Sequence, residues 1–228
     1  KGIISNPNCT TLSMIVAMGA LNKKYQLKEL VVASYQAASG AGQPGIDALR
    51  AQISAVAGKN LGEATGDVRT VVTNNDVFPA PIALNVIPWA GSLKEDGYTS
   101  EELKVRNESR KILGMPRLKV SATCVRVPVL TTHSLAVHAT FKNEVTRKGA
   151  QKLLEKAAGV TLLDDPENKK FPTPNDAVGT DATWVGRVRR SPDDKKSLDL
   201  FLCGDNLRKG AALNTAQIAE LLAVELTK

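Results

Sequence analysis

Apolar and polar positions along the chain change their spacing from block to block, which predicts a mixture of helices and strands. Leu12, Ile15, Val16 and Leu21 have helical spacing and predict a helix over residues 9–23. Residues 28–36 alternate every second position, which is typical of a strand. Further helices are predicted over 46–56, 100–113, 146–158 and 213–226, and further strands over 119–130, 134–141, 160–163, 184–190 and 198–203.

The order of these elements favours an α+β fold with a mixed, largely antiparallel sheet and helices on one face. Thr131-Thr132-His133 separates two long strand runs, which predicts an antiparallel pair of 119–130 with 134–141. Residues 191–194 separate a second predicted pair in the same way. Residues 39–45 are expected to form a flexible loop, and residues 58–98 are expected to be mostly loop. Thr99 and Glu102 have the spacing of a capping box at a helix start.

The composition limits the kinds of partner that the chain is expected to bind. The chain has 30 Lys and Arg against 23 Asp and Glu, a formal charge of +7, and only 4% aromatic residues. No long basic block or stacking motif accompanies this charge, so we expect no nucleic-acid partner but phosphorylated small molecules or an acidic partner. No apolar run is long enough for a membrane span, so no membrane partner is expected. Three cysteines without a CxxC pair predict a reducing, cytoplasmic compartment and no metal site.

Cys9 is the one cysteine in an unusual place, at a turn directly before a predicted helix. The free N–H groups of a helix start lower a thiol pKa and can hold an oxyanion, although a small residue near an N-cap explains the position equally well. Cys124 and Cys203 lie in strand-like apolar runs and are expected to be structural. Of the two histidines, His133 in its turn is a better partner for Cys9 than His138 in mid-strand.

Charged residues in two other elements have both a structural and a functional interpretation. Arg126 shares a strand face with Cys124 and Ala122, where burial requires either a protein carboxylate or a bound anion. Glu101 and Lys104 share a helix face, and a surface ion pair is the simplest local interpretation. Nucleotide-binding motifs of the GxGxxG or Walker type are absent from the sequence.

Several segments, in chain order, resemble motifs of the aspartate-semialdehyde dehydrogenase family. They are Ser5-Asn-Pro-Asn-Cys-Thr-Thr11, Ser34-Tyr-Gln-Ala-Ala-Ser-Gly-Ala-Gly42, Glu101-Glu-Leu-Lys104, Asn107-Glu-Ser-Arg-Lys-Ile-Leu113, Arg126-Val-Pro-Val-Leu-Thr-Thr-His-Ser134, Val185-Gly-Arg-Val-Arg189 and Lys209-Gly-Ala-Ala-Leu-Asn214. Glyceraldehyde-phosphate dehydrogenases and N-acetyl-glutamyl-phosphate reductases carry different residues at the first motif. The resemblance implies the C-terminal domain fold that these families share.

The resemblance also implies a role for each matching residue. Catalysis would use Cys9 as the nucleophile, His133 as the general acid and base, and Gln36 to orient the substrate. Substrate binding would use Arg126 for a carboxylate, Glu101 for an amino group, and Lys104 with Asn8 for phosphate. Asn214 would lie near the nicotinamide of NADP. The implied reaction reduces aspartyl phosphate to aspartate semialdehyde through a Cys9 thioester.

The family places its NADP-binding domain before the cysteine motif, and the sequence begins only a few residues before Cys9. We therefore expect a fragment: a catalytic and dimerisation domain over 1–210 and a helix over 211–228 that packs on the missing domain. The fragment is expected to form a homodimer and to have little activity alone. The alternatives are a catalytically silent dimerisation module and a related reductase of acyl phosphates. Equally slow iodoacetamide labelling of Cys9, Cys124 and Cys203 near neutral pH would indicate the silent module.

Overall fold

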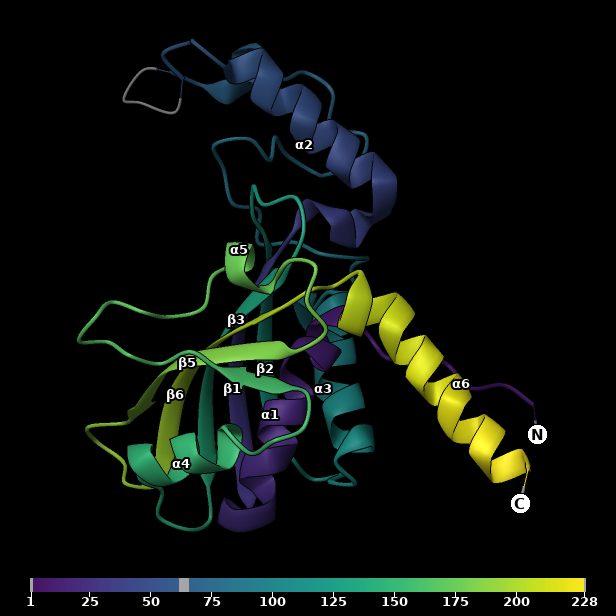
Figure 1. Ribbon diagram of the computed structural model, residues 1–228. Coiled ribbons are helices and arrows are strands. Elements are labelled where there is room, and N and C mark those ends of the chain that lie inside the picture. The colour runs from purple at the N-terminus through teal and green to yellow at the C-terminus, as the bar shows by residue number, and fades with distance from the viewer. Residues whose placement is uncertain (1, 62–65, 228) are drawn as a thin grey trace.

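Six strands form one mixed sheet at the centre of the molecule (Figure 1). The computed structural model describes residues 2–61 and 66–227. The sheet order is β2-β1-β3-β6-β5-β4. The strands are β1 (Leu27–Gln36), β2 (Lys119–Arg126), β3 (His133–Phe141), β4 (Val160–Leu162), β5 (Thr183–Arg190) and β6 (Ser197–Gly204). In these segments the β1–β2 and β4–β5 pairings are parallel and the other three are antiparallel, which confirms the predicted fold class.

The predicted antiparallel pair of 119–130 with 134–141 is wrong, because β1 lies between β2 and β3. The chain after Arg126 does not turn back as a hairpin but continues beside the segment that follows β1. There Ala38 and Ser39 donate their N–H groups to the carbonyls of Val129 and Leu130. The second predicted pair, β5 with β6, is confirmed as antiparallel.

Three helices cover one face of the sheet, as predicted. These are α1 (Cys9–Tyr25), α3 (Ser100–Ile112) and α4 (Arg147–Leu154). Met14, Met18 and Leu21 of α1 are fully buried against apolar residues of the strands, and this contact forms the main core. The predicted capping box is confirmed: Thr99 caps α3, and its backbone N–H donates to the Glu102 side chain. Each strand therefore has an inner face under helices and an outer face without them.

The outer face of the sheet carries exposed apolar side chains. Val31 and Tyr35 of β1 are 46% and 37% exposed, and Tyr35 packs beside the ring of Phe201 from β6. Their inward-facing neighbours Leu30 and Val32 are buried. An alternating strand with apolar residues on both faces is typical of a sheet that is covered on both sides in its assembled state.

A smaller lobe stands above the sheet and is built around α2 (Gly42–Val56) (Figure 1). Its own apolar cluster includes Leu49, Phe78 and Ile82. The predicted flexible loop at 39–45 is wrong, because η1 (Ala38–Ala41) is a short 3-10 turn and α2 already starts at Gly42. The predicted loop at 58–98 holds only η2 (Val68–Thr70) and η3 (Glu95–Gly97) in the described part, and residues 62–65 of that prediction lie outside it.

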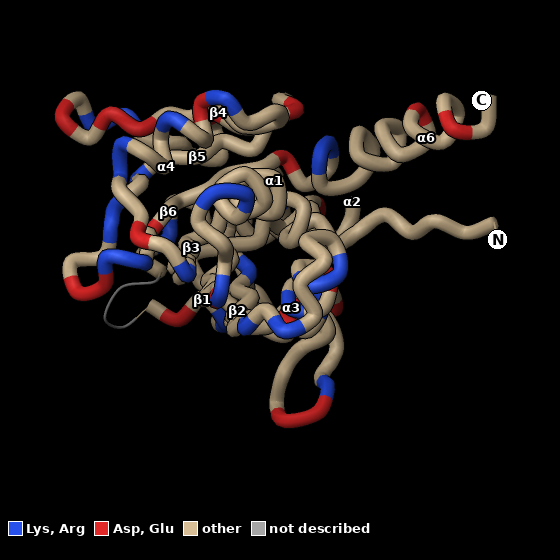
Figure 2. Tube along the Cα trace, turned by 90° about the horizontal axis from the view of Figure 1, so that it is seen from below, with Lys and Arg blue, Asp and Glu red and all other residues tan. Residues whose placement is uncertain are grey.

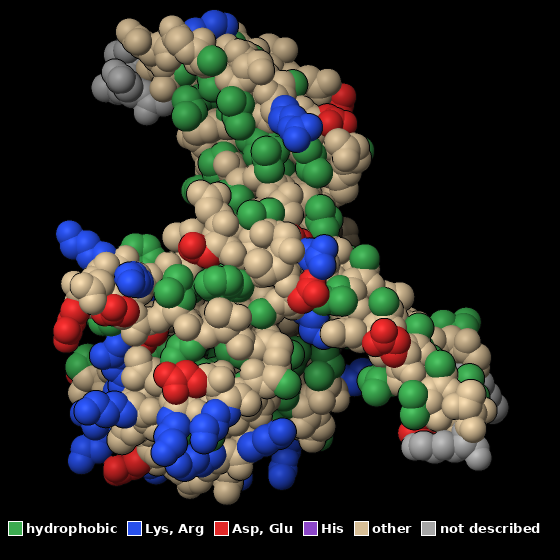
Figure 3. Space-filling view, viewed as in Figure 1, with side chains coloured by type: hydrophobic (Ala, Val, Ile, Leu, Met, Phe, Trp, Pro, Cys, Tyr) green, Lys and Arg blue, Asp and Glu red, His purple; other side chains and the backbone are tan. Residues whose placement is uncertain are grey.

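The last helix, α6 (Leu213–Leu226), projects from the body as an arm (Figure 1). It follows the π-helical turn η4 (Arg208–Ala212), whereas the short α5 (Pro174–Ala177) lies near β5 and β6. Leu221 and Leu226 are 69% and 84% exposed, and hydrophobic side chains are visible along the arm in Figure 3. Both chain ends lie on this side of the molecule (Figure 2). Residues 2–8 have no regular secondary structure.

Charged side chains are spread over the surface, with Lys and Arg gathered around α4 (Figure 3). Lys148 and Lys152 of α4 and Lys195 and Lys196 of the β5–β6 turn contribute to this basic region. Among the described residues, no helix has the length and apolar character that crossing a membrane requires.

Candidate active site

The sheet register places three predicted site residues at the same end of three neighbouring strands. Gln36 is the last residue of β1 and pairs with Arg126, the last residue of β2. His133 begins β3, on the other side of β1 from Arg126. Their side chains are buried on the helix-covered face, where alternate strand residues point the same way. The sequence placed His133 in a turn, and the structure places it at the start of a strand.

Cys9 reaches this end of the sheet from the start of α1. Asn8 is the N-cap: its side-chain oxygen accepts the N–H groups of Thr10 and Thr11. This cap fixes Cys9 as the first helical residue, with Sγ 3.2 Å from Nε2 of His133. The structure therefore brings together the predicted nucleophile and its predicted partner. His138 lies elsewhere in β3, where Nδ1 is 2.9 Å from a carboxylate oxygen of Asp199.

The hydrogen bonds of His133 determine which ring nitrogen carries its proton. The backbone N–H of Ala37 donates to Nδ1 over 3.0 Å, so Nδ1 is an acceptor and the proton of the neutral ring is on Nε2. Burial, assisted by the positive charge of Arg126, lowers the pKa of His133 to about 3. At neutral pH the ring is therefore uncharged, and Nε2–H is directed to the sulfur.

The expected lowering of the Cys9 pKa is not found. Burial raises the pKa of the Cys9 thiol, and the negative charge of Glu101 raises it further. Arg126 and the backbone N–H of Thr10 act in the opposite direction, so the effect of the helix start is present but is outweighed. Cys124 and Cys203 are buried, and burial raises their pKa to about 12 and about 11, as expected of structural cysteines.

Arg126 and Glu101 line the same cavity, which has a volume of about 400 Å³. Arg126 is 7% exposed, and Nη1 donates to the carbonyl of Ala37 over 3.1 Å. Within residues 2–61 and 66–227, no carboxylate forms a salt bridge with it. Burial lowers the pKa of the guanidinium, although the negative charge of Glu101 acts in the opposite direction. Of the two interpretations of Arg126, the structure favours a site for a bound anion.

Glu101 links the remaining substrate-binding candidates. Nδ2 of Asn8 donates to Oε2 of Glu101 over 2.6 Å, and Nζ of Lys104 donates to Oε1 over 2.9 Å. The hydrogen bond and charge of Glu101 raise the pKa of Lys104. Glu108, one turn further along α3, accepts the backbone N–H of Asn8 over 2.7 Å. Glu108 was not predicted as a site residue, although its helical spacing from Glu101 and Lys104 places it on the same face.

Gln36 contacts α1 directly. Its Nε2 donates to Oγ1 of Thr10 over 2.6 Å, and its Oε1 is buried without a hydrogen-bond partner among the described residues. A buried, unpaired amide oxygen is costly and is commonly satisfied by a ligand or water. Gln36 is thus held beside Cys9 with one acceptor atom free.

Asn214 stands at the start of α6, in a cluster with Asn6. Nδ2 of Asn214 donates to Oδ1 of Asn6, and Nζ of Lys209 donates to Oδ1 of Asn214, each over 2.7 Å. Gly210 brings the same segment against Cys9, since a Cβ at Gly210 would lie 2.9 Å from Cβ of Cys9. Asn6 and Lys209 lie in the quoted motif segments, but no role was predicted for them from the sequence.

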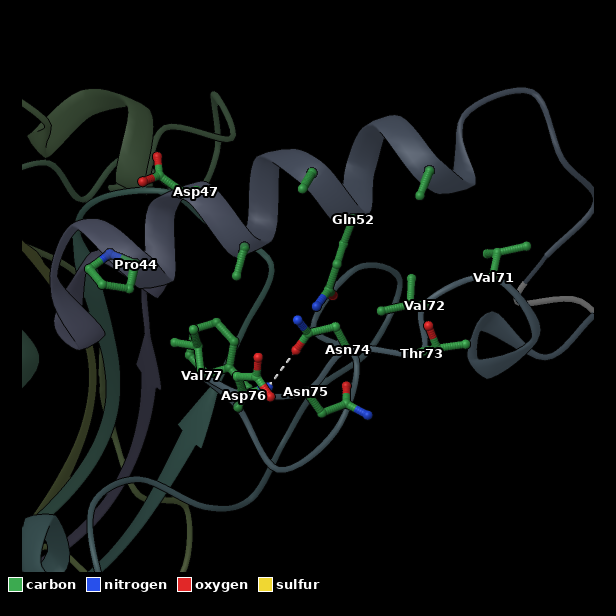
Figure 4. Close-up of a pocket in the computed structure, with 14 residues that line it drawn as sticks. Pro44, Asp47, Gln52, Val71, Val72, Thr73, Asn74, Asn75, Asp76 and Val77 are labelled. Carbon is green, nitrogen blue, oxygen red and sulfur yellow. Dashed lines mark hydrogen bonds between the residues drawn. The ribbon is translucent and has the colours of Figure 1, made fainter.

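A second cavity, of about 470 Å³, lies between α2 and residues 71–78 (Figure 4). Gln52 points into it in Figure 4, and Oε1 of Gln52 accepts the N–H groups of Ile82 and Ala83. These contacts hold the lobe together, and none of the predicted site residues lines this cavity.

Comparison with known proteins shows which family the chain belongs to. The family described as "Semialdehyde dehydrogenase, dimerisation domain" matches residues 18–209. This chain belongs to that family. The aspartate-semialdehyde dehydrogenases of Corynebacterium glutamicum and Mycolicibacterium smegmatis are 50% and 47% identical to it, over 97% and 99% of the chain.

Among solved structures, aspartate semialdehyde dehydrogenase II of Vibrio cholerae in complex with ASA has a TM-score of 0.88 and 36% identity. That match covers 97% of this chain and 62% of the Vibrio chain. This chain spans 64% of the length of the Corynebacterium glutamicum relative and 65% of the length of the Mycolicibacterium smegmatis relative. The resemblance seen in the sequence motifs is thereby confirmed.

Proposed function

We propose that the chain is the catalytic and dimerisation part of an NADP-dependent aspartate-semialdehyde dehydrogenase. The reaction is the reductive dephosphorylation of aspartyl phosphate to aspartate semialdehyde, in lysine, threonine and methionine biosynthesis. The observation that carries this proposal is the 3.2 Å contact of Cys9 with His133 beside the cavity that Arg126 and Glu101 line.

The positive charge of Arg126 and the negative charge of Glu101 match the α-carboxylate and the α-ammonium group of a free amino acid. Arg126 binds the α-carboxylate through its guanidinium, and Glu101 binds the ammonium group. Lys104 and Asn8 bind the phosphate, for which Lys104 supplies a positive charge next to the N-terminus of α1. Gln36 orients the acyl group with its unpaired Oε1 or its Nε2.

The chemistry then follows from Cys9. The Cys9 thiol first loses its proton to water, since Nε2 of His133 already carries one. The thiolate attacks the acyl carbon, a C–S bond forms, and the C–O bond to phosphate breaks with its electron pair leaving on phosphate. The product is a thioester on Cys9. His133 keeps its proton and gives a hydrogen bond through Nε2–H, first to the thiolate and then to the oxygen that becomes negative at the acyl carbon. Bound NADPH would supply a hydride to the thioester. The Cys9 thiolate would then be the leaving group, and the aldehyde would be released.

The residues around Asn214 fit a nicotinamide. The side-chain amides of Asn6 and Asn214 offer both donors and acceptors to a carboxamide, and Gly210 keeps this segment free of a side chain where it approaches Cys9. We assign Asn214 to this contact. Most of the NADP-binding surface belongs to a domain outside residues 1–228, so the isolated chain has little dehydrogenase activity.

The proposal divides the chain into two parts. Residues 1–210 form the catalytic and dimerisation domain, and residues 211–228 form the helix that packs on the NADP-binding domain. The exposed Leu221 and Leu226 of α6 support this, because they have no apolar partner on the described part of the chain.

A homodimer completes the proposal. The outer face of the sheet, with Val31 and Tyr35, is the apolar surface on which a second copy packs. Val31→Lys places a charge in this interface and should shift the sedimentation coefficient from dimer to monomer. Val178→Lys is the matched control, since Val178 is 48% exposed away from β1. An unchanged dimer in Val31→Lys would place the interface elsewhere.

The catalytic proposal is tested without cofactor. Mixing the chain with aspartyl phosphate should release about one equivalent of phosphate per Cys9 and leave an aspartyl thioester that mass spectrometry detects on the Cys9 peptide. Cys9→Ala should give neither product. N-acetyl-glutamyl phosphate, whose acylated nitrogen has no charge for Glu101, should react much more slowly, and faster reaction with it would favour the alternative reductase.

Two further outcomes separate the remaining alternatives. Absence of both phosphate release and thioester in a folded chain would indicate a catalytically silent dimerisation module. Steady NADP-dependent oxidation of aspartate semialdehyde by the isolated chain at the rate of a complete enzyme would contradict its assignment as a fragment.

A further inference from the structure

Thr132, the residue before His133, has a backbone conformation that β-branched residues rarely adopt. Its φ is +85°, in the left-handed region that favours glycine. Its side chain is fully buried, and Oγ1 has no hydrogen-bond partner in the described segments. Nothing in the Thr132 side chain therefore compensates for the backbone strain. Such strained residues persist where surrounding contacts hold them, commonly at functional sites.

Asn206 supplies the contact that holds this conformation. Its side chain is buried just after β6, and Oδ1 accepts the backbone N–H of Thr132 over 2.9 Å. The same side chain exchanges hydrogen bonds with Ser39, where Nδ2 donates to Oγ over 2.9 Å and Oγ lies 3.2 Å from Oδ1. Asn206 thus joins the segment before His133 to the segment that begins at Ala37.

Both joined segments contact the imidazole. Thr132 is bonded to His133 through the backbone, and Ala37 donates to Nδ1 of His133. Gly40, one residue after Ser39, approaches the ring so closely that a Cβ there would lie 3.0 Å from Cε1. The position of the ring therefore depends on the backbone conformation at Thr132, and its tautomer depends on the N–H of Ala37.

We propose that Asn206 is a positioning residue, which holds Thr132 in its left-handed conformation and thereby directs Nε2–H of His133 to Cys9. This rests on the proposed function of His133 and Cys9, but it concerns a residue that contacts neither substrate nor sulfur. Because glycine adopts the left-handed conformation freely, a glycine at position 132 should make the contact with Asn206 unnecessary.

The test compares Asn206→Ala, Thr132→Gly, the double variant and Ser39→Ala. One readout is ¹⁵N NMR of the imidazoles, which reports tautomer and protonation, with His138 as the internal reference. The other is the rate of Cys9 alkylation by iodoacetamide as a function of pH. Asn206→Ala should show mixed tautomers at His133 and alkylate Cys9 about tenfold more slowly at a fixed pH near 9, since a hydrogen bond to the thiolate is lost.

The decisive comparison is whether Thr132→Gly restores both readouts in the Asn206→Ala background. The double variant should return to within about threefold of Thr132→Gly alone, and Ser39→Ala should stay near the unsubstituted chain in both readouts. The proposal is overturned if Asn206→Ala changes neither readout, if the double variant is as impaired as Asn206→Ala or does not fold, or if Ser39→Ala reproduces the defect. Neither readout uses substrate or cofactor, so failure of the thioester experiment would reject the proposed function independently.

Discussion

The backbone N–H of Ala37 donates to Nδ1 of His133, and this bond leaves the ring proton on Nε2, 3.2 Å from the sulfur of Cys9. A ring held in this way gives a hydrogen bond through Nε2–H, but as a neutral ring it has no acidic proton to transfer. It cannot take the proton of the thiol, because Nε2 is already protonated and Nδ1 faces a donor. This geometry therefore supports His133 as a hydrogen-bond donor to the sulfur, and proton transfer to or from the ring would require a change in these contacts.

His133 should make the stability of the chain depend on pH below neutrality. Its pKa is about 3 in the folded chain and has an ordinary value of 6.5. The unfolded chain therefore binds more protons between these values, so stability is complete above about pH 6.5 and falls as the pH drops toward 3. Near pH 4.5 the free energy of unfolding should be lower by about 2 to 3 kcal/mol from this residue. Urea unfolding of the unsubstituted chain and of His133→Gln, which cannot titrate, should show a smaller pH dependence in the variant.

Cys9 should be the cysteine that reacts first, but only in alkaline solution. Burial and Glu101 raise its pKa, so the isolated chain should label slowly with iodoacetamide near neutral pH. Cys124 and Cys203, with pKa values of about 12 and about 11 and buried side chains, should label later still. Peptide mapping of the labelled chain at several pH values measures the order. Rapid labelling of Cys9 at pH 7 would show that the thiolate is stabilised by something other than the contacts described.

Glu101→Gln should make Cys9 more reactive. Removing this negative charge lowers the pKa of the thiol and should raise the alkylation rate at a fixed pH near 8 by roughly threefold to tenfold. Binding of the substrate ammonium group to Glu101 would neutralise the same charge, so the nucleophile would be activated by the substrate that it attacks. Glu108→Gln is the matched control, because it removes a charge from the same helix and Gln can still accept the N–H of Asn8. Equal acceleration in both variants would indicate a general field effect of α3.

Arg126→Met should separate stability from ligand binding. A buried guanidinium without a carboxylate partner in the described segments is unfavourable, so replacing it with an apolar side chain should leave the free energy of unfolding unchanged or raise it by about 1 kcal/mol. The same change removes the charge that lowers the Cys9 pKa, and alkylation should become slower. Thioester formation with aspartyl phosphate should be lost. Clear destabilisation of Arg126→Met would mean that Arg126 has a structural role.

Gly40→Ala should disturb the site without unfolding the chain. A Cβ at position 40 would collide with Nη1 of Arg126 and lie 3.0 Å from Cε1 of His133, so both side chains must move. Thioester formation should fall by at least about tenfold, since small displacements of catalytic groups have large effects on rate. Gly19→Ala in α1 is the control: its Cβ would meet only Leu113 at 3.6 Å, and the free energy of unfolding should stay equal or rise by about 1 kcal/mol. A normal rate in Gly40→Ala would show that the site has room to relax.

Local patterns were sufficient to predict much of the fold. The spacing of apolar residues predicted α1 and most of α2, because a helix face depends only on neighbours three and four residues away. The Thr99 and Glu102 capping box was predicted for the same reason, since both partners lie within one turn. The cysteine motif pointed to the family, and the chain carries it at a helix start as predicted.

Only the tertiary structure decided how these elements are arranged and what charge state the site has. β1 enters the sheet between β2 and β3, and strand order depends on hydrogen bonds between segments far apart in the chain, which no local pattern contains. The Cys9 pKa is raised because burial and Glu101 of a distant helix outweigh the local helix start. The left-handed Thr132 and its contact with Asn206 were likewise invisible in the sequence, because a β-branched residue gives no local signal for such a turn.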